Sequence, residues 1–297
     1  MNFFIDVKFN EFYANNPITI IDVGAAGGIH KRWKKINKYL KAYCFEPDKR
    51  SYEKLSDDAN IIYRNIGLNN KKSIVKLHLT KKPTCSSIYP PNEKLINNFP
   101  KSDRFCVIKK VDIKTDTLDN QLSLLDCNNV DFIKLDTQGS ELNIIQGAKN
   151  ILNSVFGLEI EVEFNPIYID QPLFCHINSF LSNYGFQLFD LRLSRWSRKS
   201  YGRGQLIAAD TIYFKSLNYL KNFSKDKILK SISICLLYGF FGYAISLSNT
   251  AYKNKILSKD ENDLIISNIE SGFYLSKFRY KITDVIWKLY YLINYTY

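Results

Sequence analysis

The clearest chemical pattern in the chain is IDVGAAGG, residues 21–28, where a hydrophobic run leads through Asp22 into a turn containing Gly24 and Gly27. Glycines after a strand let the backbone pass close to a ligand and lead into a helix. Glu46 ends the next apolar run, AYCFE, roughly 20 residues later, the usual place of an acid that accepts hydrogen bonds from both ribose hydroxyls. Together these residues indicate a site for a nucleoside cofactor.

The spacing of the glycines separates two cofactor classes. A nicotinamide fingerprint counted from Gly24 needs glycines at positions 26 and 29, where this chain has Ala26 and Ile29, so that fingerprint fails. The D-x-G-x-x-G pattern of Asp22, Gly24 and Gly27 instead resembles the first motif of class I S-adenosylmethionine-dependent methyltransferases. We expect Asp22 to hold the turn or to meet the methionine part of the cofactor through water.

Three further side chains could do acid–base chemistry. Asp136 ends the strand-like run VDFIKLD, and ligands bind at the carboxyl edge of open α/β sheets. It could pair with the methionine ammonium, orient an acceptor hydroxyl or act as base, or it could simply cap the helix that starts at Gly139. Glu163 ends another such run, and His30 follows the glycine turn. Their plainer alternatives are a solvated strand-end acid and a surface histidine.

The elements that must position these residues alternate along the first two-thirds of the chain. Short β-rich runs alternate with helix-like segments, which predicts an α/β, Rossmann-like sheet of about seven strands with helices on both faces and the last two strands adjacent. NNKK, residues 69–72, suggests a hairpin between the runs on either side, and 107–115 has the pattern of an edge strand. The run 208–214 can close the sheet. The expected strands are residues 18–24, 42–46, 60–67, 130–136, 155–164, 186–193 and 208–214.

The pattern changes after residue 216, where helical stretches replace the strands. We expect a lead-in segment at 1–17, a methyltransferase domain at 18–216 and an all-helical C-terminal extension at 217–297. Residues 231–252 carry no charge and are long enough to span a bilayer, yet serines and glycines dilute them. A helical hairpin broken near Tyr238 and Gly239 is favoured over a spanning helix, with peripheral membrane contact as an alternative.

Composition limits the class of protein. The chain has 297 residues, 45% hydrophobic and 14% aromatic, which excludes a disordered or collagen-like chain. Six cysteines without a C-x-x-C pair favour reduced thiols and no metal site, and the N-terminus does not resemble a signal peptide, so a cytoplasmic location is expected. The net charge of +12 is spread along the chain except in 192–205, where four arginines gather.

Over about residues 18–215 the chain resembles the FkbM family of methyltransferases. The family's pieces occur in order as IDVGAAGG, CFEPD, NIGLNN, TDTLD and FIKLDTQGSELNIIQGA. The last block is the most specific, because the family usually shows K-x-D-x-E-G-x-E there. This chain departs from the pattern at Gln138, which replaces an acid, and at Ala26, where many members have Asn.

The resemblance implies a class I methyltransferase that moves a methyl group from S-adenosylmethionine to a hydroxyl of a sugar, glycan or related small molecule. Arginines in the 192–205 segment could bind a phosphate or carboxylate of the acceptor, so an anionic or lipid-linked acceptor should be tested. The residues expected to bind the cofactor are Asp22, Gly24, Ala25, Gly27, Glu46, Asn65, Ile66 and Asp136. Those expected at the acceptor are Ser86, Ser87, Glu141, Arg195 and Trp196, with Asp136, Glu163 and His30 as the catalytic candidates.

Two other functions stay open. FNPIY, residues 164–168, resembles the N-P-P-Y element of enzymes that methylate amino groups of nucleic-acid bases, but it follows the fifth strand rather than the fourth and Ile167 replaces a proline. No dense basic cluster accompanies it, so nucleic acid is not the expected partner. The other alternative is a non-catalytic domain that binds cofactor and recruits partners.

Overall fold

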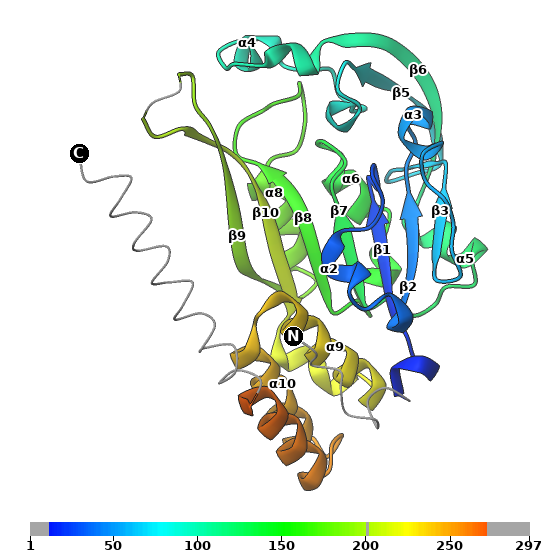
Figure 1. Ribbon diagram of the computed structural model, residues 1–297, viewed down its shortest axis with the longest axis vertical. Helices are drawn as coiled ribbons and strands as arrows, with labels where there is room; N and C mark the ends of the chain where they lie inside the picture. Colours follow the sequence, from blue (N-terminus) through cyan, green and yellow to red (C-terminus); the bar gives the residue numbers. More distant parts are fainter. Residues whose placement is uncertain (1–11, 200–201, 272–297) are drawn as a thin grey trace. The chain divides into compact units, whose positions relative to one another are not determined.

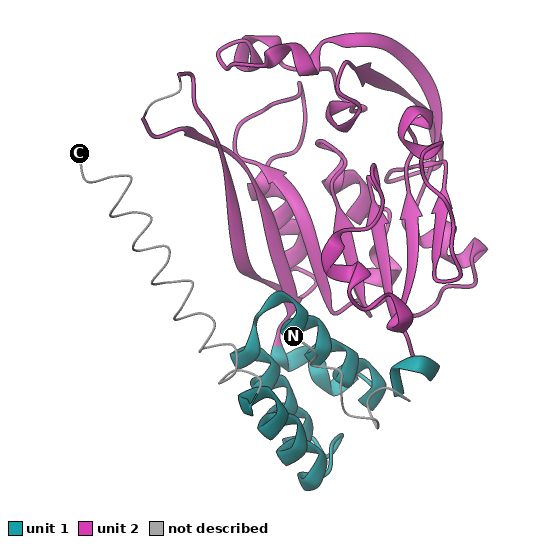
Figure 2. Cartoon of the chain, in the orientation of Figure 1, with its two compact units in different colours: residues 1–15, 217–297 teal, residues 16–216 magenta. Residues whose placement is uncertain are grey.

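A computed structural model describes residues 12–199 and 202–271 of the chain. It contains two compact units, shown in different colours in Figure 2: residues 16–216, and residues 1–15 together with 217–297. The β-strands belong to the first of these units and the longest helices to the second (Figure 1).

The main sheet of residues 16–216 has seven strands. Its order is β3 (Ile61–Arg64), β2 (Leu40–Phe45), β1 (Ile18–Val23), β7 (Phe132–Leu135), β8 (Gly157–Glu163), β10 (Gln205–Lys215) and β9 (Phe186–Trp196). The first five strands run parallel, and β10 is antiparallel to both of its neighbours. The Rossmann-like sheet with its last two strands adjacent is therefore confirmed. The expectation that 208–214 closes the sheet is wrong, because β9 forms the edge and β10 lies inside it.

Helices cover both faces of this sheet (Figure 1). Successive side chains of a strand point to opposite faces, so Ile133 and Phe132 of β7 lie on different sides. Ile133 belongs to the core that includes side chains of α5 (Leu118–Leu124), α6 (Glu141–Gln146), α7 (Lys149–Leu152) and α8 (Phe174–Ser182). On the other face, Phe132 contacts the buried Trp33 of α2 (Lys31–Lys34), with ring centroids 5.3 Å apart.

A second sheet of three strands corrects two expectations. Its order is β4 (Gly67–Leu68), β6 (Val107–Asp116), β5 (Ser73–Thr80), so β6 is the central strand and not an edge. The predicted hairpin across residues 69–72 is also wrong, since β5 pairs antiparallel with β6. The turn residues indicate that the chain reverses but not which strand becomes the partner. The lysines of β6 give its sequence the pattern of an edge strand. They are exposed because one face of this small sheet is open to solvent, although β6 is the central strand.

The second unit is helical in its described part. After η4 (Leu217–Asn222), α9 (Lys225–Tyr238) ends at Gly239, whose left-handed φ of 89° allows the chain to turn into α10 (Phe241–Lys253). The predicted hairpin broken at this point is confirmed. In the described part of the chain, no helix is long and apolar enough to cross a membrane. Contact of 231–252 with a membrane surface stays a prediction, and most of 1–17 and the tail beyond 271 lie outside the described residues.

Candidate active site

A cavity lies at the carboxyl ends of β1, β2 and β7, where the order of the strands reverses. Residues of both sheets line it. Open α/β sheets bind ligands at such switch points. The lining residues are Val23, Gly24, Ala26, Glu46, Pro47, Asp48, Gly67, Leu68, Leu77, Pro83, Thr84, Ser86, Ile88, Ile113, Thr115, Asp136, Thr137, Gln138, Ser140 and Ile144.

The glycine turn forms one side of the cavity. Gly24 has φ of 78°, and a Cβ placed there would lie 1.9 Å from the backbone oxygen of Asp136, so only glycine lets the two strand ends approach this closely. The N–H groups of Gly24 and Ala25 donate to the Phe45 carbonyl at 3.0 and 3.2 Å. Gly27, with φ of 87°, has no atom within 4 Å of its Cβ position; it is exposed and does not line the cavity.

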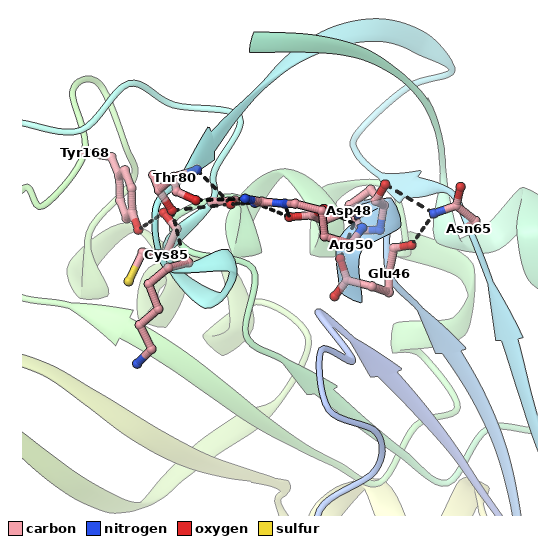
Figure 3. A network of polar contacts seen from close by, with 10 residues as sticks. Glu46, Asp48, Arg50, Asn65, Thr80, Cys85 and Tyr168 are labelled. Atoms are coloured by element: carbon pink, nitrogen blue, oxygen red, sulfur yellow. Dashed lines mark hydrogen bonds and ion pairs between the residues drawn. The ribbon is translucent and has the colours of Figure 1, made fainter. Parts of the chain in front are cut away.

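Glu46 projects into this cavity from the end of β2. Its carboxylate is 5% exposed, and its Oε1 accepts a hydrogen bond from the Asp48 N–H at 2.8 Å. Burial raises the pKa of Glu46 to about 7, and the negative charge of Asp48 acts in the same direction. Asn65 donates from Nδ2 to the carbonyls of Glu46 and Pro47, at 2.8 and 3.2 Å (Figure 3). Asn65 therefore fixes the backbone that carries Glu46.

The predicted pair Asn65 and Ile66 does not line the cavity. Ile66 packs against the main core, and the next two residues, Gly67 and Leu68, line the cavity instead. The third strand ends earlier than expected, at Arg64, so the residues that reach the ligand position shift along the chain by two.

Asp22 is buried beside the cavity and forms an ion pair across the sheet. Its Oδ1 lies 3.2 Å from Nζ of Lys134, which is also 3.7 Å from Oδ2 of Asp136. Burial raises the pKa of Asp22, and the charge of Lys134 opposes this shift. Burial disfavours the charge of Lys134, but the carboxylates of Asp22 and Asp136 outweigh it and raise the Lys134 pKa. Asp22 thus positions Lys134 and does not itself line the cavity.

Asp136 lines the cavity with a carboxylate that is 41% exposed. Its Oδ1 accepts from Nε2 of Gln138 at 3.3 Å, and the same amide donates to Oε2 of Glu161 at 2.5 Å. The Gln138 Oε1 accepts from the Tyr168 hydroxyl at 2.8 Å. The glutamine thus donates to two neighbouring carboxylates, and burial together with the charge of Asp136 raises the pKa of Glu161. Gln138 reaches them from a left-handed backbone, with φ of 60°.

Glu141 and Glu163 lie just outside the cavity, each 1% exposed. Glu141 accepts from the N–H groups of Thr137 and Gly139, at 2.6 and 2.9 Å, so it holds the turn before α6. Glu163 accepts from Nε2 of Gln171 at 2.8 Å. Burial raises the pKa of both acids. The structure does not bring these two predicted residues into contact with the cavity.

His30 is the N-cap of α2. Its Nδ1 accepts from the Arg32 N–H at 3.2 Å, and the residue does not line the cavity. Partial burial lowers its pKa, and the charge of Arg32 adds to this effect. The turn into α2 thus uses His30 as a cap, which is the plainer of the roles that a histidine after the glycine turn can take.

The two serines of the 81–106 loop have different positions. Ser86 lines the cavity, and its Oγ accepts from Nη2 of Arg50 at 3.0 Å. Ser87 is buried, and its hydroxyl donates to the Gln138 carbonyl at 2.6 Å. Ser87 therefore anchors the loop, whereas Ser86 stands where a ligand could reach it.

Arg195 and Trp196 lie apart from the cavity, in the hairpin of β9 and β10. Arg195 donates to the Gly204 carbonyl at 3.3 Å. The Trp196 ring packs against Phe99 and Phe105, with centroids 5.4 and 5.7 Å apart, and Arg104 lies over it. The hairpin has its own open hollow beside Trp196, lined further by Arg198 and Arg203.

Sequence reasoning missed Arg50, Tyr168 and the contribution of the second sheet. Arg50 follows the CFEPD motif by two residues and could have been found as a cation next to two acids. Tyr168 contacts the loop through its hydroxyl, 2.9 Å from the Cys85 carbonyl. No local pattern could have placed Leu77, Ile113 and Thr115 on the cavity, because their position depends on how the second sheet pairs.

The fold and this cavity define a class I methyltransferase. A family model for the methyltransferase FkbM domain matches residues 22–188. The chain therefore belongs to the FkbM methyltransferase family and is an S-adenosylmethionine-dependent methyltransferase. No curated protein matches it.

Solved structures with a similar fold are distant in sequence. The magnesium protoporphyrin IX methyltransferase of Synechocystis is 8% identical, with 70% of this chain and 76% of that chain covered and a TM-score of 0.33. A methyltransferase of Anabaena variabilis is 10% identical, covering 67% and 77%, with a TM-score of 0.36. TrmK of M. capricolum, solved with S-adenosylhomocysteine, is 12% identical, covering 90% and 97%, with a TM-score of 0.31.

Proposed function

We propose that the protein transfers a methyl group to a hydroxyl oxygen of a sugar, glycan or related small molecule. The observation that carries this proposal is the half-exposed carboxylate of Asp136 at the cavity. The Gln138 amide holds one of its oxygens and Lys134 lies 3.7 Å from the other. A carboxylate in this position can orient an acceptor hydroxyl and accept its proton.

The cavity fits the cofactor on two observations. The glycine turn lines it through Gly24 and Ala26, and Glu46 presents a buried carboxylate that can accept hydrogen bonds from ribose hydroxyls. When bound, S-adenosylmethionine supplies an electrophilic methyl group on its sulfonium. The chain's own contribution is then to bind the ribose through Glu46, to hold the acceptor in line and to receive its proton at Asp136.

Methylation of nucleic-acid bases is less well supported because the FNPIY segment is used in packing. Asn165 donates to the Leu206 carbonyl at 2.8 Å and accepts from Gln205 at 3.2 Å. Ile167 and Tyr168 are buried, and none of the five residues lines the cavity. An element that recognises a flipped base needs its Asn and its aromatic ring accessible to that base.

The proposal is tested by incubating the purified protein with methyl-labelled S-adenosylmethionine and four acceptors. These are a neutral oligosaccharide, a sugar phosphate, a uronic-acid oligosaccharide and single-stranded DNA. We expect label on a hydroxyl oxygen of at least one carbohydrate, identified by mass spectrometry, and none on DNA. Label on the DNA bases, or on no hydroxyl of a wider cellular glycan extract, contradicts the proposal.

The role of Asp136 is tested by Asp136→Asn. With the acceptor found above, we expect the turnover rate to fall by about 10²- to 10⁴-fold, the range for removal of a general base. Binding of S-adenosylhomocysteine, measured by calorimetry, is the control and should persist. If turnover persists as well, Asp136 is not the base.

A further inference from the structure

The Arg50 side chain joins two parts of the cavity wall (Figure 3). Arg50 lies in α3 (Lys49–Tyr52), and its Nε is 3.0 and 3.1 Å from the two carboxylate oxygens of Asp48. In the opposite direction, Nη1 donates to the Thr80 carbonyl and Nη2 to Oγ of Ser86, each at 3.0 Å. One guanidinium therefore binds a carboxylate on the main sheet's side and two oxygens on the second sheet's side.

The two parts that Arg50 joins are the two sides of the cavity. Asp48 follows β2, lines the cavity and donates its N–H to Glu46. Thr80 ends β5, and Ser86 belongs to the 83–88 segment, of which Pro83, Thr84, Ser86 and Ile88 also line the cavity. The segment is held to β5 by the Thr80 N–H, which donates to Oγ of Ser86 at 3.2 Å, and by the pairing of Ser87 with His78. Arg50 adds the contact that ties it to Asp48, beside Glu46.

The middle of the 83–88 segment is also held from the opposite side of the cavity, at the residues on either side of Ser86. The Ser87 hydroxyl donates to the Gln138 carbonyl at 2.6 Å, and the Tyr168 hydroxyl lies 2.9 Å from the Cys85 carbonyl. The segment is therefore held between Arg50, near Glu46, and Gln138, near Asp136. Cutting the contact at Arg50 removes the tie between this segment and Asp48, next to the acid that we assign to the ribose.

The chemistry of this contact needs an arginine. The guanidinium is planar and offers several N–H donors in fixed directions, whereas a lysine ammonium is a single point charge on a flexible chain. A lysine at position 50 can keep the ion pair with Asp48 but cannot also reach the Thr80 carbonyl and the Ser86 hydroxyl in the same geometry.

We propose that Arg50 is a positioning residue for the cofactor: it fixes the 83–88 segment and the Asp48 carboxylate so that Glu46 and the cavity wall face the ligand at the right separation. The proposal rests on the assignment of this cavity to S-adenosylmethionine. It concerns a residue that touches Asp48, Thr80 and Ser86 and that does not itself line the cavity.

The test is titration calorimetry of the full chain with S-adenosylhomocysteine. We expect Arg50→Ala to weaken binding by about 10- to 100-fold, the range for losing hydrogen bonds to a charged group, and Arg50→Lys to recover part of the loss. Lys49→Ala is the matched control, since it removes the same charge from an exposed position of the same helix and should bind as the unaltered protein does.

A pH series distinguishes positioning from a general loss of structure. The charged groups around Glu46 are Asp48 and Asp136, and Arg50 balances the former. In the unaltered protein, affinity should fall as pH drops through about 7, because Glu46 then becomes protonated. Arg50→Ala leaves Asp48 unbalanced, which raises the pKa of Glu46 further and moves this midpoint to higher pH. Ser86→Ala should weaken binding without moving the midpoint.

Two results overturn the proposal, and a third variant shows which step has failed. Binding by Arg50→Ala that matches Lys49→Ala, or a weaker affinity with an unmoved midpoint, refutes the positioning role. Glu46→Ala tests the cavity assignment separately: if it binds S-adenosylhomocysteine normally, the cofactor does not use this carboxylate and the assignment itself is wrong. Thermal unfolding without ligand identifies any variant that has lost its fold.

Discussion

The two halves of the cavity are built in different ways. In the half that we assign to the cofactor (the cofactor half), formed by the glycine turn, Gly67–Leu68 and the two buried acids Glu46 and Asp48, the backbone determines the shape. In the carboxylate half, formed by Asp136, Gln138 and Glu161 with Lys134, side-chain charges lie close together and an amide and an ammonium group balance them. This difference predicts that added atoms destabilise the fold at the cofactor half, whereas added or removed charge destabilises it at the carboxylate half.

The largest effect should come from the backbone contact at Gly24. In Gly24→Ala the new Cβ would meet the Asp136 backbone oxygen, which cannot move aside, in addition to the left-handed φ. We expect destabilisation beyond the roughly 1–3 kcal/mol that such a φ alone costs, measured by chemical denaturation or seen as loss of soluble protein. Gly27→Ala shares the φ but meets no atom, so it should cost only that amount. Equal costs for the two variants would show that the close approach does not matter.

In the carboxylate half, the largest effect should come from removing Lys134. Lys134→Met leaves the buried Asp22 without its cation, and breaking a buried pair in this way costs about 3–5 kcal/mol. Burial raises the pKa of Asp22 in the folded state above its value in the unfolded chain. Between these two pKa values, Asp22 keeps its proton in the folded state but loses it in the unfolded chain. The deficit should therefore grow as pH rises from about 4 to 7 in urea denaturation. The double variant Asp22→Asn, Lys134→Met should recover most of the loss, and a stable single variant would contradict the pairing.

A smaller effect tests the amide between Asp136 and Glu161. Gln138→Glu places a third carboxylate there, so it should destabilise the fold by about 1–3 kcal/mol at neutral pH. The pKa of the new acid would be raised by its neighbours, and stability should return as pH falls and the acid becomes protonated. Gln138→Ala adds no charge and should show no such pH dependence. If both variants respond to pH alike, the charge at position 138 is not the cause.

The smallest effect should come from His30, which follows the glycine turn along the chain. His30→Ala removes the cap of α2 and should cost about 0.5–1 kcal/mol of stability. Affinity for S-adenosylhomocysteine should not change, because the histidine does not line the cavity. His30→Asn can keep the capping hydrogen bond and should restore the stability. A large drop in methyl transfer without a change in stability would instead indicate that His30 has a catalytic role.

The cofactor half could be predicted from the sequence because its function depends on spacing within short segments. Strand, glycine turn and strand-end acid follow one another locally, so the positions of Gly24 and Glu46 on the cavity can be predicted without knowing any distant contact. The same holds for the seven-stranded sheet and for the helix break at Gly239.

The carboxylate half could not be predicted in the same way, since its contacts join segments far apart in the chain. Alternation indicates which face a residue of β8 takes but not that Glu161 meets Gln138 while Glu163 meets Gln171. The pairing of the second sheet is also non-local, and it alone decides that Leu77 and Thr115 reach the cavity. Arg50 belongs to this group because Thr80 and Ser86 lie 30 and 36 positions away.

The short strand β4 gives the second sheet one more property. Gly67 and Leu68 pair with Thr115 and Asp116, and the Asn69 N–H donates to the Asp116 carbonyl at 2.8 Å. The two ends of the segment 69–114 therefore lie side by side. This segment contains β5 and most of β6, and the pairing of β4 with β6 joins its two ends. Segments whose ends lie side by side tolerate exchange and changes of length. The second sheet, which forms part of the cavity wall, can therefore change in sequence and length while the strands that carry the glycine turn and Glu46 stay as they are.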